Sequence, residues 1–312
     1  MSIDYCLLTN DVETTSIWLN KLRDKTGEKV LREGMPLLID IYEKFNIQST
    51  FFFVADYAKQ YPNIVKMILS YGHEVASHGY THEVDQAFDV LPLKKQIAHL
   101  NDSKKILEDI SGREVISFRA PALRINRYTA TALTETGYKI DSSVPSQRFD
   151  MFLSFGSKKK LKWITAPRLP YRTDKYDLTR KGDGAIVEIP LSSTIFPYVG
   201  TTMRLFPNIT KLQRRLLHLE SVRNGKPVVF DIHPNEFIDE SDEDRTIERR
   251  TKNFISYILA DLVRSKLKVK NLGPKAIPLY EDEIRFYLKR NYTFTTIREY
   301  CEWEGYLECD RC

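Results

Sequence analysis

Short apolar runs alternate with amphipathic segments along most of the chain. Five apolar runs are too short for buried helices and predict strands, at residues 5–8, 50–54, 74–76, 115–118 and 138–140. Apolar residues recur at helical spacing between these runs, over residues 34–45, 61–71, 93–110 and 126–135. Further along, the pattern predicts a helix over 209–222, a strand over 227–232, a helix over 246–266 and a last strand-to-helix turn from Phe294. Repeated strand-then-helix units indicate an α/β fold with mainly parallel strands and helices outside them.

The chain reads as one domain over residues 1–312. No repeat period, low-complexity tract or linker is visible in it. Between about residues 151 and 190 the pattern changes to aromatic and basic residues with prolines, which predicts an insertion of loops and a hairpin. We therefore expect a single (β/α) barrel that carries one insertion.

Polar residues follow several of the predicted strands directly. They are Asp11, His78, Arg119, Asp141 and His233. In a parallel barrel the carboxyl ends of the strands converge on one face, and active sites are built there. The sequence therefore predicts that these side chains gather around one site.

A histidine pair and an acidic segment predict a metal centre at this face. His78 and His82 are four residues apart, so both imidazoles reach one ion if the segment turns helically. That spacing alone is common among surface and capping histidines. Asp11-Val12-Glu13 adds carboxylates, and residues i and i+2 of an extended segment share a side. Amide hydrolysis at such a centre needs a general base and a general acid, for which Asp11 and His233 are the candidates.

These segments resemble the motifs of the NodB-type polysaccharide deacetylases, a family with a distorted (β/α) barrel. Five motifs occur in the family's order: Thr9-Asn10-Asp11-Val12-Glu13, Ser77-His78-Gly79-Tyr80-Thr81-His82, Phe118-Arg119-Ala120-Pro121, Tyr138-Lys139-Ile140-Asp141-Ser142-Ser143 and Phe230-Asp231-Ile232-His233-Pro234. Together they span residues 9–234, which is more specific than any one of them. The end of the chain, 292–297, also resembles the last strand and helix start of such domains.

The resemblance implies a role for each matched residue. Glu13, His78 and His82 would bind one divalent transition metal, with zinc expected first and cobalt or nickel as alternatives. Asp11 would be the catalytic base, oriented by Arg119. Asp141 would tune His233, the general acid.

One departure from the family's pattern leaves two alignments. Many members carry adjacent Asp-Asp, and in that alignment Asn10 would replace the base while Asp11 would bind the metal, which predicts a crippled enzyme. Other members use a spaced acidic pair, which Asp11-Val12-Glu13 fits. We favour the spaced alignment, which together with Arg32-Glu33-Gly34-Met35-Pro36 is similar to deacylases of surface polysaccharides and lipid-linked aminosugars.

Net charge and the first residues of the chain bear on the class of substrate and on the expected localisation. A net charge of +5 and a pI near 8.8 fall short of the concentrated charge of a dedicated nucleic-acid binder. The first residues show no secretory signal pattern, so we expect the protein in the cytoplasm or at the inner face of the membrane. The favoured function is removal of an N-acyl group, N-acetyl first, from an amino sugar of a surface glycan or its nucleotide- or lipid-linked precursor. A cyclic-amide or ureide amidohydrolase and a non-catalytic sugar-binding relative are the alternatives.

Three remaining segments have a structural and a functional interpretation. The helix over residues 210–219 either packs on the barrel, which we favour, or lies on a membrane surface. The basic run from Ser157 to Trp163 is either a solvated hairpin or a phosphate-binding element. Cys301, Cys309 and Cys312 either have no joint role, as we expect, or form a zinc knuckle. The sequence leaves the oligomeric state open.

Overall fold

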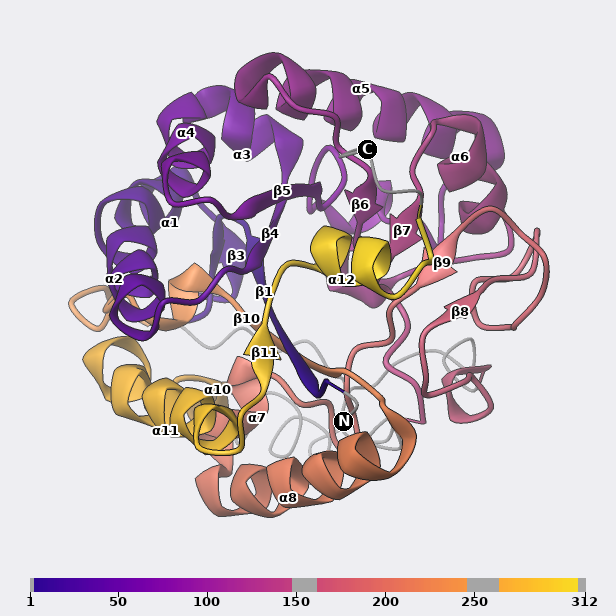
Figure 1. The fold of residues 1–312 in the computed structure, drawn as a ribbon. Helices are drawn as coiled ribbons and strands as arrows, with labels where there is room; N and C mark the ends of the chain where they lie inside the picture. Colours follow the sequence, from indigo (N-terminus) through magenta and orange to yellow (C-terminus); the bar gives the residue numbers. More distant parts are fainter. Residues whose placement is uncertain (1–2, 148–161, 246–263, 308–312) are drawn as a thin grey trace, which may run out of the picture.

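The computed structural model describes residues 3–147, 162–245 and 264–307 (Figure 1). In these ranges nine strands form one curled sheet in the order β10-β1-β4-β5-β6-β7-β9-β8, and β11 also pairs with β1. Every pair is parallel except β8 with β9. The strands are β1 (Tyr5–Val12), β4 (Thr50–Phe53), β5 (Glu74–Ser77), β6 (Ser117–Phe118), β7 (Ile140–Asp141), β8 (Tyr171–Arg172), β9 (Val187–Glu188), β10 (Val228–Ile232) and β11 (Thr293–Phe294). The short strands β2 (Thr15–Ser16) and β3 (Lys21–Leu22) form a separate antiparallel pair.

Helices surround the curled sheet on its outer side (Figure 1). They are α1 (Asp24–Lys29), α2 (Met35–Phe45), α3 (Ala55–Gln60), α4 (Pro62–Ser70), α5 (Leu93–Ser111), α6 (Thr129–Glu135), α7 (Gly200–Leu205), α8 (Pro207–Asn224), α10 (Arg264–Lys268) and α11 (Ala276–Leu288). The last helix, α12 (Ile297–Trp303), lies within this ring in the view of Figure 1. Its buried residues pack into the apolar cluster inside the curl.

Side chains alternate between two apolar cores along each strand. Leu7 of β1 and Phe52 of β4 point into the curl, where they meet the residues of α12. Leu8 and Phe53 belong to the larger core between the sheet and the outer helices. This two-residue period sends every second residue of a strand to the interior of the barrel.

The two ends of the sheet approach each other without a full strand between them. After β9, the backbone N–H of Ser192 donates to the Val229 carbonyl of β10 at 3.2 Å, and the Val229 N–H donates to Ser192 Oγ at 2.9 Å. Val199 forms an isolated parallel bridge with Asp231. The fold is therefore a distorted half-barrel with mainly parallel strands and outer helices, which confirms the predicted fold class.

Some predicted elements differ from the structure. Residues 187–188 form β9 and pair with β7, so the end of the predicted insertion belongs to the main sheet. A two-residue strand is too short to show a period in the sequence, which is why it was assigned to the insertion. Helices α1, α3, α7 and α11 were not predicted. The predicted helix over 246–266 and the first half of the insertion lie largely outside the described residues.

No helix in the described ranges is both long enough and apolar enough to cross a membrane.

Candidate active site

The carboxyl end of β1 presents two carboxylates to the interior of the barrel. Asp11 and Glu13 are buried and share the inner side with Thr9. Asn10 points the other way, and its Nδ2 atom donates to Ser49 Oγ at 2.7 Å. The strand therefore has the spaced arrangement, and Asn10 does not occupy the position of a base.

The two histidines come together through a bend rather than a helical turn. Residues 78–82 have no helical structure, and Gly79 has a φ of +75°. A Cβ atom at Gly79 would lie 3.2 Å from His99 Cε1, so the close packing of His99 also favours glycine at this position. The ring centroids of His78 and His82 are 5.6 Å apart. The expected helical turn was wrong, although the expected meeting of the two rings is observed.

One set of side chains has the composition and geometry that suit a divalent metal. Ligand atoms of Glu13, His78 and His82 all lie within 4.8 Å of one another. Glu13 Oε2 is buried without a well-oriented hydrogen bond in the described residues, although His82 Nε2 lies 2.8 Å away. His78 Nδ1 lies 2.9 Å from the Arg119 carbonyl, which as a hydrogen bond leaves Nε2 unprotonated toward the site. The donor set therefore fits a transition metal with two imidazoles and one carboxylate.

Protonation of these three groups is set by burial and by their mutual charges. Burial lowers the pKa of His78 to about 4, so this ring is neutral at pH 7. Burial opposes ionisation of Glu13, but the contact with His82 and the charges of the neighbouring imidazoles together outweigh burial and bring the pKa to about 2. In His82 burial disfavours the charged imidazole, but the charge and contact of Glu13 together with the Asp11 charge outweigh burial, so the pKa is raised.

Arg119 is fully buried and holds the base candidate in place. Its Nη1 atom lies 2.9 Å from Asp11 Oδ1 and 2.7 Å from Asp231 Oδ1. Its Nε and Nη2 atoms donate to the carbonyl and the hydroxyl of Ser142 at 3.0 and 2.9 Å. Burial raises the pKa of Asp11, but the charge and hydrogen bond of Arg119 together with the nearby imidazole charges outweigh burial, so the net pKa is lowered and the carboxylate is ionised at pH 7. The second carboxylate, Asp231, has a raised pKa because of burial and the adjacent Asp11 charge.

His233 lies across the site with its Nδ1 atom facing two carboxylates. Nδ1 is 3.5 Å from Glu236 Oε1 and 3.9 Å from Asp231 Oδ2. Burial disfavours its charge, but the hydrogen bond to Glu236 and the Asp231 charge outweigh burial and raise the pKa to about 10. Glu236 itself is fixed by a buried ion pair with Arg204. His233 is therefore protonated at pH 7, with Nε2 4.0 Å from Glu13 Oε1.

Asp141 was expected to tune His233, and in the structure its hydrogen-bonding neighbours are Ser143 and Glu188. Asp141 accepts a hydrogen bond from Ser143 Oγ at 2.6 Å and lies beside Glu188 of the neighbouring strand. The carboxylates around His233 are Asp231 and Glu236 instead. Asp231 could have been found from the sequence, because it is two residues before His233 in a strand and shares its side. Glu236 lies beyond the strand, so the two-residue spacing of a strand does not relate it to His233.

Asp141 and Glu188 form a buried carboxyl pair behind Arg119. Asp141 Oδ2 and Glu188 Oε2 have no other hydrogen-bond partner in the described residues. Burial raises the pKa of both groups, and the Asp141 charge raises that of Glu188 further. One proton shared by the pair satisfies both oxygens. Glu188 Oε1 also accepts from the Val144 N–H at 3.0 Å, so the pair fixes the segment that carries Ser142.

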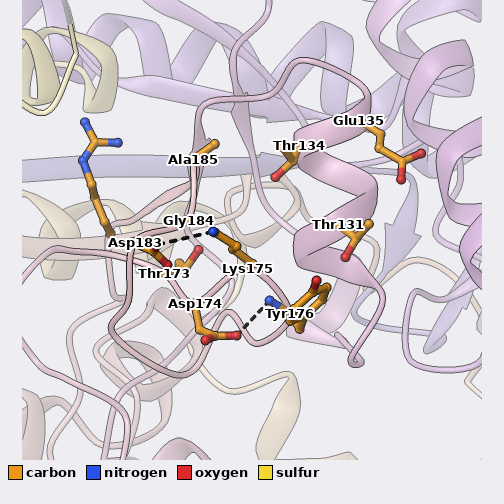
Figure 2. Close-up of a pocket in the computed structure, with 11 residues that line it drawn as sticks. Thr131, Thr134, Glu135, Thr173, Asp174, Lys175, Tyr176, Asp183, Gly184 and Ala185 are labelled. Atoms are coloured by element: carbon orange, nitrogen blue, oxygen red, sulfur yellow. Dashed lines mark hydrogen bonds and ion pairs between the residues drawn. The ribbon is translucent and has the colours of Figure 1, made fainter.

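Cavities lie beside the site and away from it. A polar cavity of about 280 Å³ adjoins His82 and is lined by Arg23, Asp24, Asp56 and Gln60 among others. A larger cavity of about 640 Å³ lies between α6 and the segment 172–185, with Tyr176 and Lys175 on its wall (Figure 2). None of the predicted site residues lines the larger cavity, so the cavity beside His82 is the candidate for substrate.

A curled parallel sheet with carboxylates and histidines at the carboxyl ends of its strands defines a NodB-type barrel. The family model described as polysaccharide deacetylase matches residues 24–140 of the chain. This confirms the resemblance seen in the sequence.

Individual relatives cover parts of the chain. A peptidoglycan deacetylase of Helicobacter pylori is 28% identical over 116 residues, which are 37% of this chain and 39% of that protein. A peptidoglycan deacetylase-like protein of Gibberella zeae is 26% identical over 65% of this chain and 61% of its own length. The solved structure of a probable polysaccharide deacetylase from Pseudomonas aeruginosa PAO1 superposes with a TM-score of 0.59 at 15% identity, covering 97% of this chain and 93% of that one. The first two matches span less than two thirds of those relatives, and the third shows the fold.

Asn10→Asp tests the register of β1. The hydroxyl proton of Ser49 is already donated to the Leu8 carbonyl, so Ser49 Oγ can only accept a hydrogen bond from residue 10. An aspartate carboxylate there has no proton to donate, so two acceptors would face each other. We expect a loss of about 1–3 kcal/mol in the free energy of unfolding, measured with urea. Asn101→Asp, at an exposed position of α5, is the matched control and should change little. Unchanged stability of Asn10→Asp would contradict the outward orientation of Asn10.

Glu188→Ala and Glu188→Gln test the shared proton. Alanine leaves the Val144 N–H and the Oδ2 atom of Asp141 without a partner, so we expect a loss of about 1–3 kcal/mol in urea unfolding. Glutamine keeps an acceptor for Val144 and a donor for Asp141, so it should lie close to wild type. An equal loss in both variants would show that Glu188 is ionised and that no proton is shared.

Proposed function

We propose that this protein is a metal-dependent hydrolase that removes an N-acyl group, N-acetyl in the first instance, from an amino sugar of a surface glycan or its precursor. The observation that carries the proposal is the meeting of two groups of side chains. Glu13, His78 and His82 converge on one point, and Asp11, Asp231 and His233 form a second cluster whose ligand atoms also lie within 4.8 Å of one another.

Metal chemistry fits the first cluster. A divalent ion held by Glu13, His78 and His82 would polarise the acyl carbonyl and lower the pKa of a water molecule. The neutral state of His78 and the ionised state of Glu13 are the forms in which these side chains act as ligands. Zinc is the ion expected first, and cobalt and nickel suit the same ligands.

Asp11 is placed to take the proton of the attacking water. Its carboxylate is ionised at pH 7 because Arg119 and the nearby imidazole charges together outweigh the effect of burial on its pKa. Arg119 engages Oδ1 at 2.9 Å, and Oδ2 faces His78 Nε2 at 3.7 Å. The base is therefore held by one oxygen, and its other oxygen is directed toward the metal ligands.

His233 is placed to protonate the departing amine. Its Nδ1 atom faces Asp231 and Glu236, so the Nε2–H points toward Glu13 and the centre of the site. The four nearby carboxylates raise the pKa of the imidazole to about 10, which keeps a proton available at neutral pH. Proton transfer from His233 as the C–N bond breaks yields a neutral amine and a carboxylic acid, and the acid leaves as carboxylate when its proton returns to His233.

The substrate class follows from the surroundings of His82 and from the relatives. The adjoining cavity is lined mainly by polar side chains, which suit the hydroxyl groups of a sugar. The relatives from Helicobacter pylori and Gibberella zeae carry the names of peptidoglycan deacetylases, which supports an N-acetylated amino sugar. We extend this to nucleotide- or lipid-linked precursors on the basis of the spaced acidic pair.

Asp11→Asn should remove the base without disturbing the metal ligands. We expect kcat for acetate release from N-acetylglucosamine oligomers to fall roughly 10²- to 10⁴-fold, as for the loss of a general base. Metal content, measured by plasma mass spectrometry, should stay at the wild-type level. Near-full activity in this variant would overturn the assignment of Asp11 as the base.

His78→Ala combined with His82→Ala should abolish metal binding. Wild-type protein purified without chelator should hold about one equivalent of a transition metal, which the double variant loses. His73→Ala is a matched control, because this buried imidazole lies outside the ligand cluster. Wild-type protein that takes up no zinc, cobalt or nickel would end the metal-dependent proposal.

A further inference from the structure

Helix α8 presents its polar side to the protein and its apolar side to solvent. Five residues of the helix are buried, and Leu217 is the only aliphatic side chain among them; the set is Thr210, Gln213, Arg214, Leu217 and Ser221. A surface helix of a globular protein normally shows the opposite arrangement, with an apolar stripe facing the core. Packing within the described part of the protein therefore does not explain why the apolar side of α8 faces solvent.

The solvent side of α8 carries a continuous apolar stripe. It is formed by Ile209, Leu212, Leu216, Leu219 and Val222, at the three- and four-residue spacing of one helix face. Leu212 is 59% exposed and Leu219 is 65% exposed. Exposed Phe206, just before the helix, stacks on Phe196 and extends the stripe at its first turn. Figure 1 places α8 on the outer rim of the molecule, away from the centre of the sheet.

Basic residues share this side of the helix with the stripe. Lys211, Arg215 and Arg223 are exposed. Lys211 contacts Asp282 of α11 at 3.4 Å, whereas Arg215 and Arg223 have no ion pair or hydrogen bond with other described residues. The one acidic residue of α8, Glu220, turns aside to Arg168 and Lys226. The solvent face of α8 is thus apolar and cationic, with no acidic residue on it.

Polar contacts, rather than the stripe, hold α8 on the protein. Arg214 Nη1 donates to Glu283 Oε1 at 2.9 Å, and Gln213 Nε2 donates to the Phe196 carbonyl at 2.7 Å. His218 Nδ1 lies 2.9 Å from the Tyr292 hydroxyl. Because these contacts all lie on the inner side, substitutions in the stripe leave the attachment of the helix intact.

We propose that α8 docks the protein on an anionic lipid surface, with the stripe among the acyl chains and Arg215 and Arg223 at the headgroups. An apolar face with interspersed arginine and lysine is the pattern of helices that lie in the plane of an anionic membrane. A second copy of the chain fits less well, since a twofold contact through α8 would bring the unpaired arginines of both copies together. The site lies at the carboxyl ends of the strands, so docking through α8 does not use any of its residues.

Vesicle flotation tests the docking surface. Full-length protein is mixed with vesicles of phosphatidylglycerol and phosphatidylcholine in equal parts, or of phosphatidylcholine alone. We expect flotation with the anionic vesicles and not with the neutral ones. Arg215→Gln with Arg223→Gln should weaken binding roughly thirtyfold, as two cations lost near an anionic surface. Leu212→Ser with Leu216→Ser and Leu219→Ser should weaken it at least about tenfold.

Matched controls separate α8 from general surface effects. Lys94→Gln with Lys95→Gln removes two exposed charges from α5, and Val84→Ser with Val90→Ser removes exposed apolar side chains elsewhere. Both should float like wild type, and acetate release from a soluble substrate should be unchanged in the α8 variants. Absent flotation, or flotation that the α8 variants leave unchanged, would overturn the proposal. A dimer in light scattering that the leucine variant dissociates would assign the stripe to a second copy instead.

Discussion

The buried guanidinium of Arg119 is the interaction on which the site and the closure of the barrel both depend. A fully buried cation is tolerated only where charges and hydrogen-bond acceptors surround it. These come from Asp11 of β1, Asp231 of β10 and Ser142 after β7, while the Phe52 ring lies 4.3 Å from the guanidinium carbon. The ends of three strands must therefore be in register before the charge is satisfied. The same requirement that stabilises the fold also sets the position of the candidate base.

Asp11 and Asp231 lie beside the same Arg119 cation but differ in how readily each one ionises. Asp11 has a lowered pKa and Asp231 has a raised one. The single Arg119 charge does not compensate two adjacent negative charges, so ionisation of Asp11 makes ionisation of Asp231 less favourable. Asp231 also faces His233 Nδ1, which joins the base side of the site to the acid side. The arrangement keeps Asp11 ionised and His233 protonated at the same pH, and hydrolysis of an amide needs that combination at the outset.

The sequence predicted the parts of this arrangement that follow from local periodicity. Strand alternation placed Asp11 and Glu13 on one side, and the structure agrees. The histidine pair was expected on a helical turn, but Gly79 adopts a left-handed conformation that pattern reasoning does not distinguish from a helical one. Glu188 was hidden because its strand is two residues long and pairs with β7 through a contact distant in sequence. Glu236 was missed as a neighbour of His233 because its position depends on how β10 leaves the sheet.

Helix α8 shows the same limit on a larger scale. Its periodicity predicts a helix with an apolar face but does not say which face packs on the protein. A helix that packs through its apolar face and one that packs through its polar face have the same periodicity. The choice is made by Glu283 of α11 and by Tyr292, whose proximity only the tertiary structure reveals. Because Arg214 pairs inward with Glu283 and Leu217 packs in the core, the attachment of the helix does not depend on the exposed leucines of the stripe. An apolar stripe that the fold does not need, beside two arginines without an acidic partner in the described residues, is then best understood as a surface for something outside the chain.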